Sequence, residues 1–250
     1  MEEKKKLIAL LGETFFLLKK GALKLFLATL AAVFLFGLGA LCIFIMLFGF
    51  RFLMGAGLLP ALLTGLSIIA VIVLAVIVVP LYQIVIFRIL QAVDKNEPLG
   101  IKDAYRAAYA VLGSYLFVSL LLMVKVILWS FLLIVPGIIF GVLYSFAPLA
   151  FLIDGKKGQE ALVFSKAIIK PNAWKYIGYY AVAVLGVIFV GVFISLLFQF
   201  LFGLFTHIAL DEKALGKIFD FILHVFFSGF SYVLYKEWRR QSPAMQGKVQ

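Results

Sequence analysis

The chain carries little charge for its length. Only 14% of its 250 residues are charged, against about 25% in soluble proteins, while 65% are hydrophobic and the mean hydropathy is +1.14. A soluble globule of this length cannot hide so many apolar side chains from water, and disordered chains are poor in aliphatic and aromatic residues. The composition excludes both classes and predicts an integral membrane protein.

Residues that carry enzymatic or metal chemistry are also scarce. Cys42 is the single cysteine and lies in an apolar run, so the chain has no intrachain disulfide. His207 and His224 are the only histidines. The sequence contains no cluster with metal-ligand spacing, no Gly-x-Ser-x-Gly motif and no phosphate-binding loop. We therefore expect no catalytic residues, no metal and no cofactor.

Long apolar runs recur along the sequence, and a helix of about 20 such residues crosses a bilayer. We predict an all-α fold with six transmembrane helices in one polytopic domain. The predicted spans are residues 25–50, 58–87, 113–134, 138–153, 176–202 and 217–235, with a cytoplasmic amphipathic segment at 1–24 and a cytoplasmic tail at 236–250. Pro60 and Pro80 predict a tilted or kinked second span. Pro136-Gly137 predicts the turn that folds the third and fourth spans into a hairpin.

The basic residues are distributed unevenly between the two sides that six spans create. Nineteen of the 23 Lys and Arg residues lie in the N-terminus, the second and fourth connections and the C-terminus, and three lie on the opposite side. Such a bias places the basic side in the cytoplasm. We expect a protein of the inner or plasma membrane with both termini cytoplasmic. The net charge is +11, and the basic residues are concentrated between apolar runs, where a membrane surface would lie. We therefore expect them to bind anionic lipid headgroups and not nucleic acid.

Three cytoplasmic segments share a plan, in which a short amphipathic helix leads directly into a span. These segments are residues 6–20, 101–113 and 158–170. The sequence at 94–96, before the second segment, is similar to that at 154–156, before the third. One interpretation is three parallel repeats of an amphipathic helix and a helical hairpin; the other is that basic amphipathic loops occur in any helical membrane protein. Such helices either lie in the membrane surface or pack across the base of the bundle.

A longer motif is spread over residues 132–180. A Pro-Gly pair is followed by a tyrosine and a proline, an acidic residue precedes an Ala-Leu…Ser helix, and a basic turn leads to an aromatic residue. These positions are held by Pro136, Gly137, Tyr144, Pro148, Asp154, Ala161, Leu162, Ser165, Lys170 and Trp174. The motif resembles the membrane domain found before some glycerophosphodiester phosphodiesterases and related bacterial inner-membrane families, although Pro171 stands where those families usually have glycine.

The resemblance implies a six-span fold without an activity. The chemistry of those phosphodiesterases belongs to a separate soluble barrel domain, which these 250 residues do not contain. We expect Gly137 and the two prolines of the motif to shape the backbone. Tyr144 is expected to serve helix packing, with a polar pocket that it lines together with Ser145, Gln83 and Gln199 as the alternative. Asp154 and Ser165 are expected to act as a local helix cap and a packing position, with binding of a headgroup or partner as the alternative.

Three ionisable residues lie inside the predicted spans, where charge is costly and often functional. Lys125 is near the middle of the third span, and Asp220 and His224 are four residues apart on one face of the sixth. One hypothesis is a proton or ion relay in which His224 titrates near neutral pH. The other is a structural pair of Lys125 and Asp220, or a snorkelling Lys125 with a solvated Asp220.

From these features we expect a non-catalytic membrane protein that acts through contacts with lipids, a partner membrane protein or a second copy of itself. The alternative is a small-solute or ion transporter or channel with a central pathway near Lys125, Asp220 and His224, and a lipid-modifying membrane enzyme is the third candidate. A transporter needs a hydrated cavity that reaches Lys125 or His224, whereas a scaffold needs a tightly packed centre.

Overall fold

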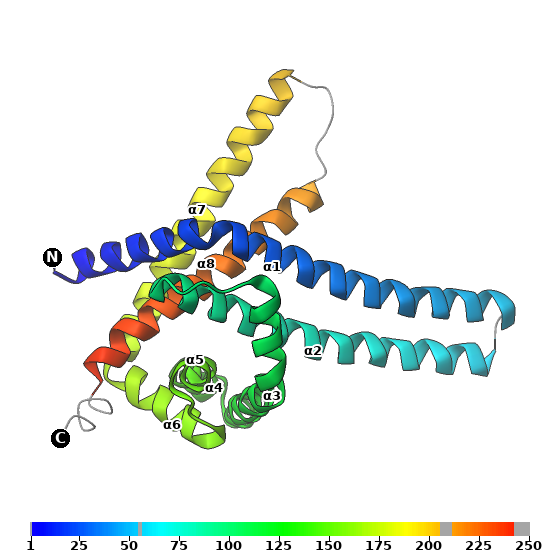
Figure 1. Cartoon of the computed structure of the whole chain (residues 1–250), viewed down its shortest axis with the longest axis horizontal. Coiled ribbons are helices and arrows are strands. Elements are labelled where there is room, and N and C mark those ends of the chain that lie inside the picture. The colour runs from blue at the N-terminus through cyan, green and yellow to red at the C-terminus, as the bar shows by residue number, and fades with distance from the viewer. Residues whose placement is uncertain (1, 55–56, 206–211, 243–250) are drawn as a thin grey trace. The chain divides into compact units, whose positions relative to one another are not determined.

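Every element of the computed structural model is a helix, within the residues that the structure describes, 2–54, 57–205 and 212–242 (Figure 1). The elements are α1 (Glu2–Met54), α2 (Leu58–Lys95), α3 (Ile101–Leu132), α4 (Ile134–Tyr144), α5 (Ala147–Asp154), α6 (Gly158–Ile169), the 3-10 helix η1 (Lys170–Asn172), α7 (Ala173–Phe205) and α8 (Glu212–Gln241). The predicted all-α fold is confirmed.

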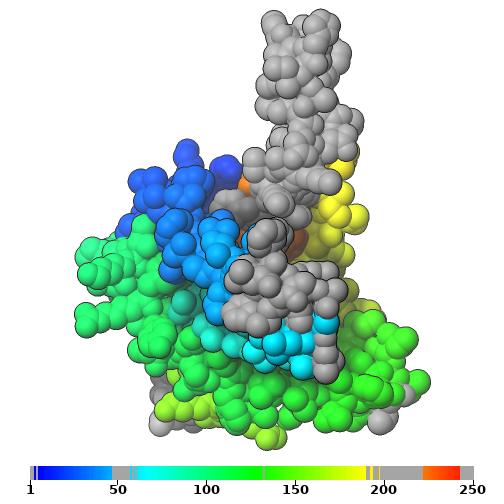
Figure 2. Space-filling view, turned by 90° about the vertical axis from the view of Figure 1, so that its right-hand side faces the viewer, coloured from blue at the N-terminus to red at the C-terminus, as the bar shows by residue number. Residues whose placement is uncertain are grey.

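Among the residues that the structure describes, four helical segments are long and apolar enough to cross a membrane. They are Lys5–Met46, Ala61–Lys95, Ile101–Phe131 and Ile134–Asp154, and they contain most of the first four predicted spans. Protein covers little of the most apolar stretches of the first three, of which 6%, 0% and 17% are buried, whereas 44% of that of Ile134–Asp154 is buried. Figure 2 shows part of this surface, with described side chains of α1 in blue and of α2 in cyan. Apolar surface of this extent is unfavourable in water and is compatible with a membrane protein.

The first and second amphipathic segments are continuous with the spans that follow them. Residues 6–20 belong to the single helix α1, and residues 101–113 are the first turns of α3. The third segment differs, because α6 is a separate helix that η1 joins to α7.

The chain forms two compact units, residues 20–116 and residues 1–19 with 117–250. In the first unit, α1 and α2 run side by side as an antiparallel pair (Figure 1). The hydroxyls of Thr29 and Tyr82 are 2.8 Å apart, and further along the pair Gly39 lies against the side chain of Leu74. Pro80 does not end α2, which continues to Lys95.

In the other unit, α3 and α4 form the predicted hairpin, but the turn lies earlier than the sequence indicates. Leu133 is extended between the helices, with φ −163° and ψ 139°, whereas Pro136 and Gly137 lie inside the start of α4. The prediction of a turn at Pro136-Gly137 is therefore wrong. Proline is tolerated in the first turn of a helix, where the N–H that it lacks has no partner within the helix.

The two helices of this hairpin meet closely. The rings of Trp129 and Phe140 stack with their centroids 4.4 Å apart. Gly137 is buried at the contact, where a Cβ atom would lie only 2.8 Å from the Cα of Ser130. Glycine is required here by the approach of two backbones.

The fourth predicted span, 138–153, is divided between two helices. α4 ends at Tyr144 and α5 begins at Ala147. Pro148 lies in the first turn of α5 and cannot donate to the carbonyl of Tyr144 four residues earlier, which its ring also crowds. The predicted span lies within the candidate segment Ile134–Asp154, and the structure adds an interruption at Ser145 and Phe146, directly before the helix that this proline begins.

α6 packs against α4 and α5. The predicted apolar stripe is almost fully buried, at 2% exposure or less for each of Ala161, Leu162, Ser165, Ile168 and Ile169. The sequence leaves open whether this segment lies in the membrane surface or packs against the other helices, and in the structure it packs against the other helices.

The N-terminal part of α1 packs along α8. Gly229 lies against the side chains of Leu18 and Thr14, and Lys236 pairs with Glu13 at 3.2 Å. The buried face of this part of α1 consists of Leu10, Thr14 and Leu17.

Candidate functional site

The break between α4 and α5 is joined to α6 by one hydroxyl. Ser165 is fully buried, donates a hydrogen bond to the carbonyl of Leu143 at 2.9 Å, and accepts one from the N–H of Phe146 at 3.1 Å. These are backbone groups that a continuous helix would have bonded internally. A single side chain therefore satisfies both sides of the break.

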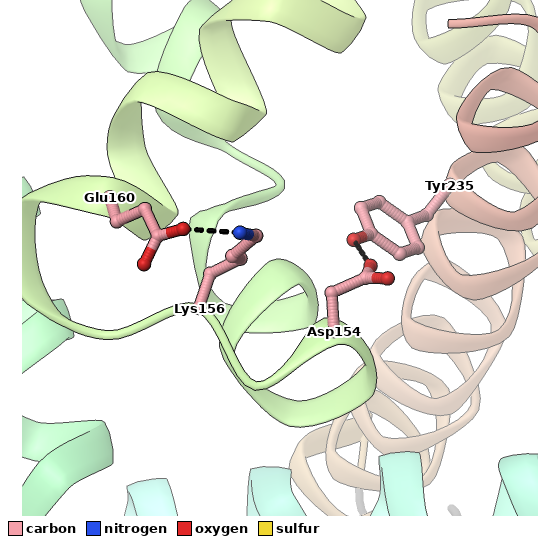
Figure 3. Close-up of polar contacts among 4 residues, drawn as sticks. All are labelled: Asp154, Lys156, Glu160 and Tyr235. Atoms are coloured by element: carbon pink, nitrogen blue, oxygen red, sulfur yellow. Dashed lines mark hydrogen bonds and ion pairs between the residues drawn. The ribbon is translucent and has the colours of Figure 1, made fainter. Parts of the chain in front are cut away.

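Asp154, the last residue of α5, is bonded to α8 instead of capping a helix. Its side chain is only 7% exposed. Tyr235 donates its hydroxyl to one carboxylate oxygen (Figure 3), and Nη2 of Arg239 pairs with the other. Tyr235 and Arg239 are four residues apart and thus on one face of α8. A buried carboxylate is tolerated only when it is paired in this way, so these contacts fix the end of α5 on α8.

A second ion pair in the same region is exposed. Lys156 pairs with Glu160 in the first turn of α6 (Figure 3). Glu160 is favourably placed at the positive end of the helix dipole. Since most of its side chain is in solvent, this pair contributes less to stability than the buried contacts of Asp154.

Phe146, at the break, is the centre of an aromatic cluster. It is fully buried, and its ring centroid lies 5.4 Å from that of Tyr176 on α7 and 5.3 Å from that of Tyr235 on α8, with Trp238 at 6.2 Å. Edge-on aromatic pairs contribute about 0.5–1.5 kcal/mol each beyond their buried area. The cluster joins the break to α7 and α8.

Hydroxyl groups extend from the break across the same helices. The hydroxyl of Tyr176 interacts with the side chains of Ser145 and Tyr180. Tyr180 is hydrogen bonded to Ser231, which in turn donates to the carbonyl of Phe227 at 2.7 Å. Each hydroxyl of this chain has a partner, as buried polar networks require.

A cleft of about 190 Å³ lies between the N-terminal part of α1 and the adjoining parts of η1, α7 and α8. It is lined by Glu3, Lys6, Ala9, Leu10, Glu13, Asn172, Lys175, Tyr179, Glu237, Trp238 and Gln241. Glu3 pairs with Lys175 at 2.8 Å and accepts the hydroxyl of Tyr179 at 2.7 Å. The Lys175 ammonium, and then the Tyr179 hydroxyl, hold the pKa of the Glu3 carboxyl below its usual value of 4.5. The cleft is polar and contains both signs of charge.

The intramembrane residues predicted from the sequence occupy α3 and α8. Nζ of Lys125 lies 5.7 Å from the ring centroid of Tyr144, a cation–π contact with a residue of the motif. His224 lies on an exposed part of α8. Asp220 is also on α8, but its side chain lies outside the described residues, and the pair of Lys125 with Asp220 stays a prediction. Neither Lys125 nor His224 lines the cleft.

The remaining motif residues differ in their surroundings. Ala161 is fully buried where α6 packs, and Lys170 and Pro171 form the 3-10 turn before α7. Trp174, in contrast, is 83% exposed at the start of α7.

Several residues of this cluster could not be selected from the sequence. From the sequence, Arg239 is one of several basic residues in the predicted cytoplasmic tail, and Tyr235 is the last residue of the sixth predicted span. Their spacing of four residues places them on one helix face, but nothing local to them points to Asp154. Glu3 and Lys175 are likewise far apart in sequence.

Within the residues that the structure describes, no group of three or more His, Cys, Asp or Glu side chains is arranged to hold a metal ion. Comparison of the chain with models of known protein families, with curated proteins and with solved structures gives no match. The resemblance to the membrane domain of phosphodiesterases stays a prediction.

Proposed function

We propose that the chain is a multi-pass protein of the inner or plasma membrane, without catalytic activity, that acts through contacts with membrane lipids or partner proteins. Six apolar runs and the bias of Lys and Arg support six spans with both termini in the cytoplasm. The observation that carries the proposal is the bare apolar surface of the long helices, since no residue in the most apolar stretch of Ala61–Lys95 is buried. Lipid is the surrounding that makes such a surface stable.

The packing at the helix break favours a scaffold over a transporter. Transporters bind substrates and ions at broken helices whose backbone groups are free. Here Ser165 occupies the carbonyl of Leu143 and the N–H of Phe146, and the Phe146 ring is fully buried. The carbonyl of Leu143 and the N–H of Phe146 are therefore not available to a transported ion.

The motif of residues 136–174 is best understood as a set of folding positions. Gly137 permits the contact of α3 with α4, Ser165 bonds the break, and Asp154 connects α5 to α8. Residues with these roles specify a packed helical arrangement. The likeness to phosphodiesterase membrane domains therefore implies a shared fold and not a shared activity.

Three parallel repeats are part of the proposal. α2 and α5, which precede the second and third amphipathic segments, both end in a left-handed residue, Asn96 with φ 58° and Gly155 with φ 66°. In both, the next N–H bonds back to a carbonyl near the end of the helix, at 2.8 Å and 3.2 Å. These similar helix ends support the correspondence between the second and third repeats. The two left-handed residues differ by one position in the aligned sequences, since Asn96 is the third residue of 94–96 and Gly155 is the second of 154–156.

Cysteine accessibility tests the scaffold against the transporter. In a Cys42→Ala background, single cysteines replace Lys125, Tyr144 or His224, with Glu97→Cys as an exposed control, and a membrane-impermeant thiol reagent is added from either side. We expect Glu97→Cys to react from the cytoplasmic side and Lys125→Cys and Tyr144→Cys to be protected. Labelling of both interior positions in folded protein indicates a water-filled route and replaces the scaffold with the transporter.

A further inference from the structure

The N-terminal part of α1 has two different faces. Leu10, Thr14 and Leu17 are buried, and Thr14 lies next to Gly229 of α8. On the opposite face, Ile8, Phe15 and Phe16 are 65%, 67% and 64% exposed. Residues 8, 15 and 16 follow the i, i+7, i+8 spacing of a single helical stripe. Three large apolar side chains on this stripe therefore have little protein cover.

Lysines lie at both ends of the exposed stripe. Lys5 is three residues before Ile8, and Lys19 is four residues after Phe15, so both share its face of the helix. Both side chains are exposed. A helix with large apolar residues between lysines on one face is typical of peripheral segments that lie in an anionic membrane surface.

The length of α1 limits where this stripe is located. The helix has 53 residues and is thus about 80 Å long, more than twice the hydrocarbon thickness of about 30 Å. With residues 25–50 as the span, an upright α1 would carry Ile8 about 25 Å beyond the hydrocarbon edge, so residues 5–19 reach the membrane surface only when α1 is strongly inclined to the bilayer normal. The stripe is nevertheless continuous with the apolar surface of the candidate span Lys5–Met46. Lipid can cover both without a second partner.

The other two amphipathic segments do not share this property. The apolar stripe of α6 is covered by α4 and α5. In residues 101–113 the stripe is buried at Ala104, Ala108 and Leu112, and Tyr109 is the large side chain left exposed. The three segments, similar in sequence, are thus packed differently.

We infer that α1 is strongly inclined to the bilayer normal and that its residues 5–19 lie in the cytoplasmic membrane surface, with Ile8, Phe15 and Phe16 among the headgroups and upper acyl chains and Lys5 and Lys19 on anionic phospholipids. This inference rests on the proposed membrane function, and it assigns the lipid contact to one segment and one face. α6 is the counterpart that packs under protein.

Site-specific quenching in the full-length protein tests the inference. In the Cys42→Ala background, single cysteines replace Ile8, Phe15 or Phe16, carry an environment-sensitive fluorophore, and are reconstituted in vesicles of phosphatidylcholine mixed with phosphatidylglycerol. Nitroxide-labelled phospholipid reports lipid contact and aqueous iodide reports water contact. These side chains are exposed, so their substitution leaves the core intact. Ile72→Cys on α2 is the lipid-facing control and Glu97→Cys is the water-facing control.

We expect all three α1 labels to be quenched by the lipid nitroxide and shielded from iodide. Nitroxide on phosphatidylglycerol should quench more than nitroxide on phosphatidylcholine. In the Lys5→Gln/Lys19→Gln variant this preference should fall, by up to about fivefold for each lysine removed. Lys102→Gln/Arg106→Gln, which removes equal charge from exposed positions on α3, should leave the preference at the α1 labels unchanged.

Two outcomes overturn the inference. Iodide quenching without lipid quenching places the stripe in water, and protection from both quenchers places it under a partner protein or a second copy. The Ile72→Cys label separates these results from failure of the proposed function. If it is quenched by lipid while the α1 labels are not, the membrane function stands and the inference alone is wrong.

Discussion

Tyr235 donates its phenolic hydroxyl to the carboxylate of Asp154, 81 residues earlier in the chain. The ring of Tyr235 also contacts Phe146 edge-on, with centroids 5.3 Å apart. One residue of α8 therefore touches both the break before α5 and the end of α5. Arg239, one turn further along α8, completes the contact by pairing with Asp154.

Loss of the Arg239 cation should destabilise the fold strongly. Arg239→Met leaves the carboxylate of Asp154 buried without its counter-charge, and breaking a buried pair in this way costs about 3–5 kcal/mol. The free energy of unfolding in detergent micelles, followed by circular dichroism during denaturant titration, measures the effect. Asp154→Asn/Arg239→Met should recover much of the loss, and Arg240→Met, at an exposed position, should change stability by less than about 0.5 kcal/mol. Equal effects of the Arg239 and Arg240 substitutions contradict the prediction.

Removal of the Ser165 hydroxyl should loosen the helix break. In Ser165→Ala the carbonyl of Leu143 and the N–H of Phe146 lose their partner, at about 1–3 kcal/mol for each buried group left unbonded. Ser67→Ala is a matched control, because that hydroxyl donates only to the carbonyl of Leu63 in its own helix, and we expect a change below about 0.5 kcal/mol. Both are measured by the same denaturant titration. Similar stabilities of the two variants would show that the bonds of Ser165 do not hold the break.

The helical segments could be predicted from the sequence because their signal is local. A run of apolar residues long enough to cross a bilayer is visible in a single window, and the 3.6-residue period identified the stripe of α6 that includes Ala161 and Ser165. Which part of the protein, if any, covers an apolar stripe depends on residues far away in the sequence and cannot be predicted from the stripe itself. The segments at 6–20 and 158–170 have similar patterns, yet one keeps Phe15 and Phe16 exposed and the other is packed on α4 and α5.

The positions of turns and of buried partners were harder to predict, for two physical reasons. Proline fits the first turn of a helix as well as a turn between helices, so Pro136 and Pro148 alone do not specify which occurs. The break after Tyr144 also depends on Ser165, a residue of another helix. Likewise, Asp154 at the end of α5 pairs with Arg239 on α8, which lies far away in the sequence. The spacing of residues within one helix contains no information about contacts with such a distant segment.

The contact of α3 with α4 should not tolerate a Cβ at residue 137. In Gly137→Ala the new atom would meet the backbone of Ser130 at 2.8 Å, and such overpacking typically costs about 1–3 kcal/mol. Gly12→Ala is the control, since no atom lies within 4 Å of its Cβ position, and alanine in a helix is favoured over glycine by up to about 1 kcal/mol. Thermal unfolding in detergent should therefore move in opposite directions for the two variants. A Gly137→Ala protein as stable as the parent would mean that α3 and α4 are further apart.

The ion pair of Glu3 with Lys175 should give acid-dependent attachment of the N-terminal part of α1. Because the pKa of the Glu3 carboxyl is lowered in the folded protein, its contribution to stability is present above the unfolded value of 4.5 and is lost as the pH falls through the lower, folded pKa. Denaturant titrations of the parent protein and of Glu3→Gln, repeated across this range, measure the contribution as a difference. We expect the parent to be more stable above pH 4.5 and the two to converge at lower pH. Lys175→Gln removes the first cause of the shift and should reduce the pH dependence, while Tyr179→Phe should reduce it less. A difference that grows as the pH falls has the opposite sign and would exclude a stabilising carboxylate at Glu3.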